Sequence, residues 1–366
     1  MANGERLSVE VLLGKTLTEL QEVALSVGLQ KFAGKQLAEW LYKRQVVSFD
    51  EMTNISLKGR EALKQRYTIG RSIPVREAIS VDGTRKYLFE VSRQPSAISN
   101  QKAEGSRLNA ESRFIESVYI PEEDRATLCV SSQAGCKMGC RFCMTGTLGF
   151  HGHLSTADIL NQIFTIDQRM TPNDQPSLSN VVFMGEGEPM DNLDSVLRAL
   201  EILTADYGCG WSPKRITVST VGVPAMKRYL DESECHLAVS LHNPFGAERA
   251  QIMPAEKMMP ATDVINLLRQ YNWAHQRRVS FEYICWHGMN DTPRHAKELI
   301  RLLRGLQCRV NLIRFHEGVN REFPSSDEKT MEWFRDYLSD NGITTTIRRS
   351  RGEDILAACG MLVAEQ

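Results

Sequence analysis

Short apolar segments alternate with helical segments from Thr127 onward, and this alternation restricts the fold more than any other feature of the chain. Strand-helix alternation predicts a parallel sheet, because each helix returns the chain to the edge from which the next strand starts. Six such units favour an α/β fold built on an incomplete (β/α)6 barrel over a full eight-fold barrel. The expected strands cover residues 127–131, 180–184, 216–220, 237–241, 279–284 and 310–314, the expected helices cover 156–168, 192–205, 262–271 and 294–306, and a seventh strand covers 344–349.

Residues 1–73 predict a small helical accessory domain in front of this core. Thr16 and Glu19 form a capping-box pattern before the first helix, and further helices are expected near residues 32–41 and 57–67. Residues 31–71 contain nine Lys or Arg and four acidic residues, a local balance of +5. This excess suits the backbone of an RNA ligand, although a solvated helix surface has the same composition.

Residues 74–125 predict a β-hairpin linker, with strands at 86–91 and 114–120. The connection at residues 94–112 is poor in large apolar residues, so we expect a mobile loop there. The barrel core then spans residues 126–366 and includes a last segment with Cys359.

The whole chain is close to neutral, because 44 Lys and Arg stand against 45 Asp and Glu in 366 residues. A hydrophobic content of 42% excludes wholesale disorder. No apolar run approaches the roughly 20 residues that cross a bilayer, and the first residues lack the pattern of a signal peptide. We therefore expect a cytoplasmic protein without a membrane partner. In a reducing compartment cysteines are kept for reactivity or metal binding rather than for disulfide staples, so the positions of the nine cysteines matter more than their number.

Three cysteines, Cys136, Cys140 and Cys143, follow the first expected strand on one loop. Thiolates this close can all reach one soft metal centre. A structural zinc ion needs a fourth ligand, which His151 or His153 can supply, whereas an iron-sulfur cube held by three thiolates keeps one iron open. The spacing does not decide between these metals, but the aromatic Phe142 and the position at a strand end favour iron.

The cysteine loop resembles the signature of the radical S-adenosylmethionine (SAM) superfamily, C-x3-C-x-aromatic-C after the first strand of a (β/α)6 barrel. The resemblance implies a [4Fe-4S] cluster on Cys136, Cys140 and Cys143, with SAM at the open iron. A lone Ser or His at a strand end can instead be a structural residue, whose polar group forms a hydrogen bond within the protein itself. The residues that match the SAM contacts of the family are Gly187 and Glu188 in a Gly-Glu-Pro motif, Ser219, Ser240, Leu241, His242 and His316, where relatives usually have Asn.

The segments Leu128–Cys136 and Arg351–Gly360 resemble a narrower family, the bacterial dual-specificity adenine-C2 methyltransferases, and this likeness covers nearly the whole chain. Without it, Cys129 and Cys359 would be small buried hydrophobic residues. The family resemblance implies methylation of C2 of an adenosine in 23S rRNA and in tRNA. It also implies an external electron donor of the flavodoxin or ferredoxin kind, and we expect a monomer.

The resemblance further implies how these cysteines act. Cys359 first receives a methyl group from one SAM molecule, and a second SAM is cleaved to a 5'-deoxyadenosyl radical that removes a hydrogen atom from this S-methyl group. The carbon radical adds to C2, and Cys129 then attacks Cys359, which frees the RNA and leaves a disulfide for an external reductant. Glu116 matches the carboxylate that accepts the C2 proton, whereas its own pattern predicts a solvent-facing strand residue.

Two other functions remain open on the sequence alone. A C8-methylating relative that confers antibiotic resistance shares the whole mechanism, although Pro189 favours C2. A zinc-stabilised RNA-binding protein without catalysis accounts for His151, His153 and the basic helices but not for Cys359. The arginines near Cys359 are expected either to clamp the RNA backbone or to keep a strand edge soluble; they are Arg348, Arg349 and Arg351. The four other cysteines are expected to be packing residues; they are Cys209, Cys235, Cys285 and Cys308.

Overall fold

The computed structural model describes residues 9–91, 113–170, 176–273, 278–316, 322–358 and 360–362. The predicted loop at 94–112 and Cys359 therefore lie outside the described residues. The chain separates into two compact units. One unit contains Met1–Ile73, Leu154–Arg169 and Asp194–Ser212, and the other contains Pro74–His153, Met170–Leu193 and Pro213–Gln366.

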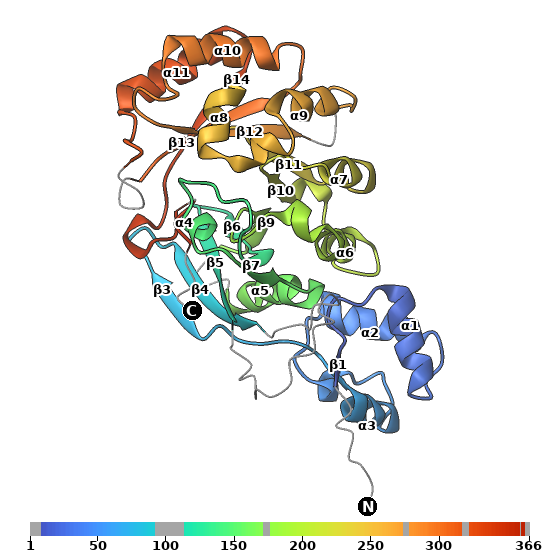
Figure 1. The fold of residues 1–366 in the computed structure, drawn as a ribbon. Coiled ribbons are helices and arrows are strands. Elements are labelled where there is room, and N and C mark those ends of the chain that lie inside the picture. The colour runs from blue at the N-terminus through green and yellow to red at the C-terminus, as the bar shows by residue number, and fades with distance from the viewer. Residues whose placement is uncertain are drawn as a thin grey trace, which may run out of the picture. The chain divides into compact units, whose positions relative to one another are not determined.

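A mixed sheet of ten strands, in the order β14-β13-β12-β11-β10-β9-β6-β5-β4-β3, forms the centre of the second unit (Figure 1). The strands from β6 to β14 in this order pair in parallel, as the strand-helix alternation predicts. Their interiors are apolar, and in β11 the first four residues are buried. The parallel strands are β6 (Ala126–Cys129), β9 (Leu178–Phe183), β10 (Ile216–Thr220), β11 (His236–Ser240), β12 (Val279–Cys285), β13 (Arg309–Arg314) and β14 (Thr344–Arg348).

Three antiparallel strands extend this sheet beyond β6: β5 (Arg113–Pro121), β4 (Arg85–Val91) and β3 (Arg76–Ile79). Val118 of β5 pairs with Lys86 on one side and with Cys129 on the other. Paired residues of antiparallel strands point to the same face, and so do residues two apart on one strand. Lys86, Glu116, Val118 and Cys129 therefore share one face of the sheet.

The helices of the second unit follow the parallel strands. In α10 and α11 an apolar stripe faces inward, and the two helices pack against each other at one end of the sheet (Figure 1). A short hairpin of β7 (Gln133–Gly135) and β8 (Phe150–His153) encloses the cysteine loop. The helices are α4 (Met144–Thr147), α7 (Met226–Glu232), α8 (Gly246–Ile252), α9 (Ala261–Leu268), α10 (Pro293–Leu303) and α11 (Glu328–Asp340), with 3-10 turns at Pro189–Asn192, Pro213–Arg215, Pro254–Lys257 and Glu353–Ile355.

The first unit joins the N-terminal helices to two helices that the alternation pattern assigns to the barrel, α5 (Thr156–Arg169) and α6 (Leu193–Thr204). The predicted capping box at Thr16 and Glu19 is present, and Glu19 also binds Arg198 of α6 at 2.8 Å. Tyr42 packs on Phe164 of α5. The N-terminal elements are β1 (Glu10–Val11), α1 (Leu17–Ser26), α2 (Ala33–Ala38), a π-helical turn Glu39–Lys43, a 3-10 turn Phe49–Glu51, α3 (Leu57–Arg66) and β2 (Tyr67–Thr68).

None of the described helices combines the length and the apolar character that crossing a membrane requires.

Candidate active site

The three cysteines of the predicted metal loop lie between β7 and α4. Cys136 follows β7 directly, and its N–H donates to the carbonyl of Gly149 at 2.9 Å. Cys143 is the residue before α4, and its N–H donates to the carbonyl of Cys140 at 3.2 Å. The hairpin and the helix thus hold both ends of the loop, and its sulfur atoms lie in largely buried positions.

The chemistry of these thiols fits a cationic iron-sulfur cluster. Burial raises the pKa of Cys136 to about 12 and raises the pKa values of Cys140 and Cys143 as well. The charges of the neighbouring cysteines further raise the pKa values of Cys136 and Cys140. Three thiolates can therefore coexist here when a cation compensates their charge.

The two histidines that could supply a fourth ligand to a zinc ion contact other groups. Nδ1 of His153 lies 3.1 Å from Nε2 of Gln133. Nε2 of His151 lies 3.2 Å from the carbonyl oxygen of Leu148.

Glu188 follows β9 and connects the ends of two parallel strands. Its Oε1 accepts the N–H of Met190 at 3.0 Å and its Oε2 accepts the N–H of Val221, after β10, at 2.9 Å. Burial raises the pKa of Glu188 to about 7. Each carboxylate oxygen has a second lone pair, so the group can still bind an ammonium.

Gly187 allows the backbone to pass close to β7 at this point. Its φ is +98°, and a Cβ there would lie 2.5 Å from the Cβ of Gln133. The same Gln133 accepts the N–H of Glu188 through Oε1 at 2.9 Å. The glycine therefore lets the cysteine-loop hairpin and the Gly-Glu-Pro segment contact each other.

The predicted residues Ser240 and Leu241, at the end of β11, are held by Arg249, a fully buried side chain of α8. Its guanidinium donates to the carbonyl oxygens of Val221, Ser240 and Leu241 at 2.6 to 3.0 Å, and it forms an ion pair with Glu256. The Ser219 hydroxyl donates to the carbonyl of Phe183 at 2.6 Å, the backbone bond that the alternative interpretation of a lone Ser predicts. Arg249 was not anticipated from the sequence.

His242 is completely enclosed beyond β11, with a left-handed backbone (φ 56°). Its Nδ1 accepts the N–H of Ile284 at 3.1 Å, and its carbonyl accepts from Asn290 at 2.7 Å. Burial, with the nearby Arg249, lowers the pKa of His242 to about 3. The ring is therefore neutral with its proton on Nε2, and it packs edge-on against Phe142 of the cysteine loop.

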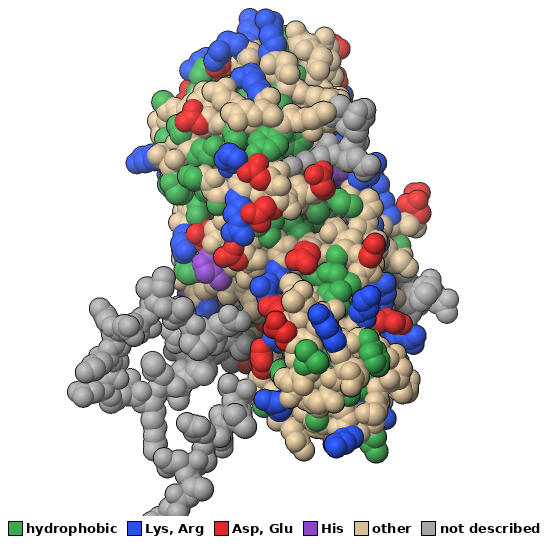
Figure 2. Space-filling model, turned by 90° about the vertical axis from the view of Figure 1, so that its right-hand side faces the viewer, with side chains coloured by type: hydrophobic (Ala, Val, Ile, Leu, Met, Phe, Trp, Pro, Cys, Tyr) green, Lys and Arg blue, Asp and Glu red, His purple; other side chains and the backbone are tan. Residues whose placement is uncertain are grey.

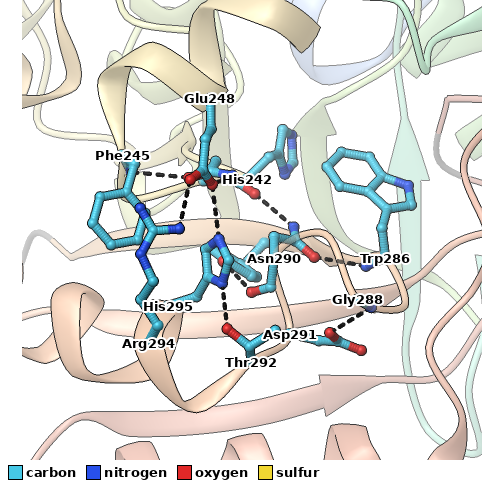
Figure 3. Close-up of polar contacts among 12 residues, drawn as sticks. His242, Phe245, Glu248, Trp286, Gly288, Asn290, Asp291, Thr292, Arg294 and His295 are labelled. Atoms are coloured by element: carbon cyan, nitrogen blue, oxygen red, sulfur yellow. Dashed lines mark hydrogen bonds and ion pairs between the residues drawn. The ribbon is translucent and has the colours of Figure 1, made fainter.

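Figure 3 shows how the loop after β12 supports this histidine. Asn290 lies between His242 and Trp286, and its Oδ1 accepts the N–H of Trp286 at 2.7 Å. On the other side, Glu248 of α8 accepts from His295 at 2.8 Å and from Arg294 at 2.7 Å. These contacts join α8 to α10 and hold the loop after β12 against the backbone of His242.

His316 follows β13 and contacts the segment after β14. Its Nε2 lies 2.5 Å from the hydroxyl oxygen of Ser350, and its Nδ1 lies 3.4 Å from Oε2 of Glu353. The imidazole thus binds Ser350 of this chain through Nε2, and its Nδ1 faces the carboxylate of Glu353.

Glu116 is buried on β5 rather than exposed to solvent, which corrects the expectation from its own pattern. The residues before β6 form an antiparallel strand, so this side chain faces the covered side of the sheet. Its Oε1 lies 2.9 Å from Nζ of Lys86, and its N–H donates to Oε1 of Glu186 at 2.9 Å. Lys86 and Glu186 were not assigned a role from the sequence.

Cys129 lies on the same face and belongs to an apolar cluster with Val118, Ala357 and Leu362. Ala357 and Leu362 flank Cys359 in the sequence, and Cys359 itself is outside the described residues. The sheet face of the predicted resolving cysteine is therefore covered by the chain segment of the predicted methyl carrier. Of the four cysteines predicted to be packing residues, Cys235 and Cys285 are buried and Cys209 and Cys308 are half-buried.

A cavity of about 720 Å³ opens beside Cys129 in the second unit. The predicted arginine cluster forms one side of it, and an acidic turn forms another. The residues that line it include Arg348, Arg349, Arg351 and His316, Glu122, Glu123, Asp124 and Arg125, and Cys129, Val182, Met184, Ala357, Ala358 and Leu362.

Comparisons with known proteins match this architecture. Residues 11–69 match the Ribosomal RNA large subunit methyltransferase N-terminal domain, and residues 130–303 match the Radical SAM superfamily. A probable dual-specificity RNA methyltransferase RlmN of Phocaeicola vulgatus is 55% identical over 352 residues, 96% of this chain and 94% of the relative. The chain belongs to the RlmN family. A dual-specificity RNA methyltransferase RlmN of Syntrophus aciditrophicus is 38% identical over 95% of this chain and 94% of the relative.

A solved structure of a radical SAM methyltransferase from Sphaerobacter thermophilus supports the RlmN assignment. It superposes with a TM-score of 0.85 and 35% identity, and the alignment covers 96% of this chain and 99% of the other. The predicted fold class, an incomplete radical SAM barrel with N-terminal helices, is confirmed. As an RlmN-family radical SAM protein, the chain uses a [4Fe-4S] cluster and SAM.

Proposed function

We propose that this chain methylates C2 of an adenosine in 23S rRNA and in tRNA, with Cys359 as the methyl carrier and Cys129 as the resolving thiol. The names of the RlmN relatives support an RNA substrate of two kinds. The observation that carries the rest is the apolar cluster in which Cys129 packs against Ala357 and Leu362, on either side of Cys359 in the sequence. Such packing suits a pair of thiols that must react with each other.

The chemistry of the substrate explains why thiols are needed. C2 of adenine lies between two ring nitrogens and is electron-poor, so it does not accept an electrophilic methyl group. A thiolate accepts the sulfonium methyl of SAM readily, which gives Cys359 its role. After C2 is bonded to the methyl carbon, the adduct must lose the C2 proton and one electron, for which the cluster would be the acceptor. Attack of the Cys129 thiolate on the sulfur of Cys359 then breaks the carbon–sulfur bond and forms a disulfide, and the released carbon takes up a proton to become the methyl group.

The cluster and SAM are held by residues at the strand ends. We assign Cys136, Cys140 and Cys143 to the cluster, which, with SAM bound, supplies the radical that takes a hydrogen atom from the S-methyl group. Glu188 takes the SAM ammonium through its free lone pairs. Gly187, Ser219, Ser240, Leu241, His242 and His316 form the remainder of the proposed SAM site, in which the neutral His242 donates a hydrogen bond from Nε2.

Glu116 takes the proton that leaves C2. Its carboxylate shares the sheet face of Cys129, and Lys86 at 2.9 Å offers a cation that stabilises the ionised form before the proton arrives. The backbone of Glu116 is held by Glu186 and by the hydroxyl of Ser131, which donates to the Glu116 carbonyl at 2.6 Å. These contacts support a fixed proton acceptor.

We expect RNA to bind through local groups of basic residues, because the chain as a whole is close to neutral and has no strong positive electrostatic potential. On the face shown in Figure 2, the described Lys and Arg side chains are interspersed with Asp and Glu, in keeping with a net charge of -1. We propose that Arg348, Arg349 and Arg351 contact phosphates at the cavity and that residues 1–73 form an RNA-binding accessory domain, followed by a linker at 74–125 and the core at 126–366.

The proposed partners follow from the reaction. An external donor of the flavodoxin or ferredoxin kind supplies electrons, and a reductant must reset the Cys129–Cys359 disulfide. We propose that the protein works as a monomer in the cytoplasm.

Mass spectrometry of nuclease-digested RNA, after reaction with the reconstituted protein, SAM and reductant, tests the proposal. We expect 2-methyladenosine in rRNA and in tRNA. Finding 8-methyladenosine would establish the C8 reaction instead, and finding no methylated adenosine with an intact cluster would overturn both.

The Cys359→Ala variant tests the role of the carrier. We expect it to lose methylation while it keeps iron and RNA binding, and the Cys308→Ala variant is the matched control. A residue that only packs would instead lower the stability by about 1 to 3 kcal/mol and leave methylation in place.

A further inference from the structure

The turn between β3 and β4, residues Ser80 to Thr84, is ordered by its own hydrogen bonds. The N–H of Ser80 donates to the Thr84 carbonyl at 2.8 Å, and the N–H of Thr84 donates to Oδ1 of Asp82 at 2.9 Å. Ser80 and Thr84 are buried, although the turn lies at the edge of the sheet. A turn this well determined can serve as a rigid support for another segment.

The supported segment is the chain after β14. The N–H of Gly352 donates to Oδ2 of Asp82 at 3.1 Å, and Asp354 in return accepts from the turn. Oδ1 of Asp354 accepts the Ser80 hydroxyl at 2.5 Å, and its Oδ2 accepts the N–H of Val81 at 3.2 Å. Figure 1 shows this segment, in red, against the β3–β4 hairpin, in cyan. One carboxylate on each side therefore binds the opposite backbone.

The local backbone of the segment is adapted to this contact. Gly352 has φ +63°, and a Cβ there would lie 2.8 Å from Cβ of Ala357 and 2.9 Å from Cγ2 of Thr84. Glycine is thus the residue that lets the segment approach the turn. Leu356 is also left-handed (φ 53°), which directs its carbonyl toward β4, where Nζ of Lys86 lies 3.4 Å away.

Lys86 connects the segment to the proposed proton acceptor. Besides the carbonyl of Leu356, the same ammonium contacts Oε1 of Glu116 at 2.9 Å. The segment before position 359 and the Glu116 carboxylate are thereby placed relative to each other by one cation.

The residues after position 359 are held by a different element. The carbonyl of Gly360 accepts the N–H of Met144 at 2.9 Å, and the carbonyl of Leu362 accepts the hydroxyl of Thr145 at 2.9 Å. Met144 and Thr145 begin α4, directly after Cys143 of the metal loop. The described residues on the two sides of position 359 are thus attached to the hairpin and to the cysteine loop.

We propose that residues 80–86 of the β3–β4 hairpin form a seat for residues 352–356, and that Asp82, Lys86 and Asp354 are positioning residues for the methyl transfer. This inference rests on the proposed function, because it explains how the segment of the methyl carrier is aligned with Cys129 and Glu116. The seat consists of hydrogen bonds and one ion pair within this chain.

The Asp354→Ala variant removes both acceptors from the segment at an exposed position, so the fold is expected to persist. The matched control is Asp340→Ala, an exposed aspartate at the end of α11. We expect kcat for RNA methylation to fall by about 10- to 100-fold in Asp354→Ala, as misplacing a reacting group by about an ångström does, with KM for RNA unchanged. Ser80→Ala should also lower kcat, and the double variant of Ser80→Ala and Asp354→Ala should have no lower kcat than Asp354→Ala alone.

Two measurements on the reconstituted protein, with neither SAM nor RNA added, test the seat without catalysis. Hydrogen exchange at the amide of Gly352 and alkylation of Cys359, followed by peptide mass spectrometry, should both be faster in Asp354→Ala than in Asp340→Ala. Equal rates in the two variants, together with unchanged kcat, would overturn the seat. A loss of kcat that occurs only together with loss of iron or with a lowered melting temperature would also overturn the seat, because it would show that these residues contribute to the stability of the fold and not to positioning. A wild type that makes no methyladenosine would refute the proposed function, while the exchange and alkylation results would still report on the seat.

Discussion

The side chain of Glu186 accepts the backbone N–H of Glu116, with 2.9 Å between Oε1 and the amide nitrogen. Its second oxygen accepts the N–H of Gly135, the residue before Cys136, at 3.2 Å. One buried carboxylate therefore joins the strand of the proposed proton acceptor to the loop of the proposed cluster ligands.

We expect Glu186→Gln to change how the stability of metal-free protein depends on pH. Burial raises the pKa of Glu186 to about 7, although hydrogen bonds from Glu116 and Gly135 lower it. The carboxyl of the unfolded chain titrates near 4.5, so folding takes up a proton between these values. Its contribution to stability is fully present below about pH 4.5 and declines by about 3 kcal/mol as the pH rises through 7.

Urea unfolding of both proteins at several pH values across this range measures the effect. The wild type should lose stability with rising pH more steeply than Glu186→Gln. Glu188 titrates in both proteins and cancels in the comparison. Parallel pH profiles would contradict the assignment.

Lys86→Met should be far more destabilising than the loss of a surface lysine. The side chains of Lys86 and Glu116 are only 16% and 6% exposed, and removing one partner of a buried pair costs about 3 to 5 kcal/mol. Lys227→Met is the control, because the side chains of the Lys227–Asp231 pair are 63% and 46% exposed and an ion pair this exposed contributes little to stability. Similar losses in the two variants, measured by chemical unfolding, would show that the Lys86 pair is effectively solvated.

Arg249→Lys should weaken SAM binding as well as stability. The ammonium of lysine cannot reproduce the fork that binds three strand-end carbonyls and Glu256, so about 2 to 4 kcal/mol of stability should be lost. Arg228→Lys, at an exposed ion pair with Glu232, is the control. Titration of SAM into both reconstituted variants measures the affinity, and an unchanged affinity in Arg249→Lys would separate this residue from the SAM site.

Cys129→Ala should trap RNA on the protein. Without the resolving thiolate, the bond between Cys359 and the substrate persists, so labelled RNA should comigrate with protein on a denaturing gel. Cys308→Ala should release its product normally. The absence of any nuclease-sensitive adduct in Cys129→Ala, under conditions where wild type turns over, would assign the resolving step to another group.

The parallel part of the fold was predictable because its strands are buried apolar runs separated by amphipathic helices. The sequence did not reveal β3 (Arg76–Ile79), which is short and has no buried residue, or β7 and β8, which are three and four residues long. The helix α11 was also missed, although Met331, Phe334 and Leu338 have helical spacing after the cap at Asp327.

The residues of the candidate site also fall into a group that the sequence predicts and a group that it does not. Cysteine spacing and polar residues at strand ends are local patterns, so the metal loop and Glu188 could be anticipated from the sequence. Arg249, Lys86 and Glu186 act on groups that are distant in the sequence, and no short motif records such contacts. Glu116 needed the fold as well, because only the pairing of β5 with its neighbours shows that its side chain is covered.

The seat between the hairpin and the last segment also has a consequence for synthesis. The contact of Ser80 with Asp354 spans 274 positions, and closing so long a loop is entropically costly and slow. A nascent chain on the ribosome can pair the earlier strands, but it cannot complete this arrangement until residues 352–362 have emerged. Translation thus delays the reactive assembly until the barrel strands that precede residue 352 have all been made.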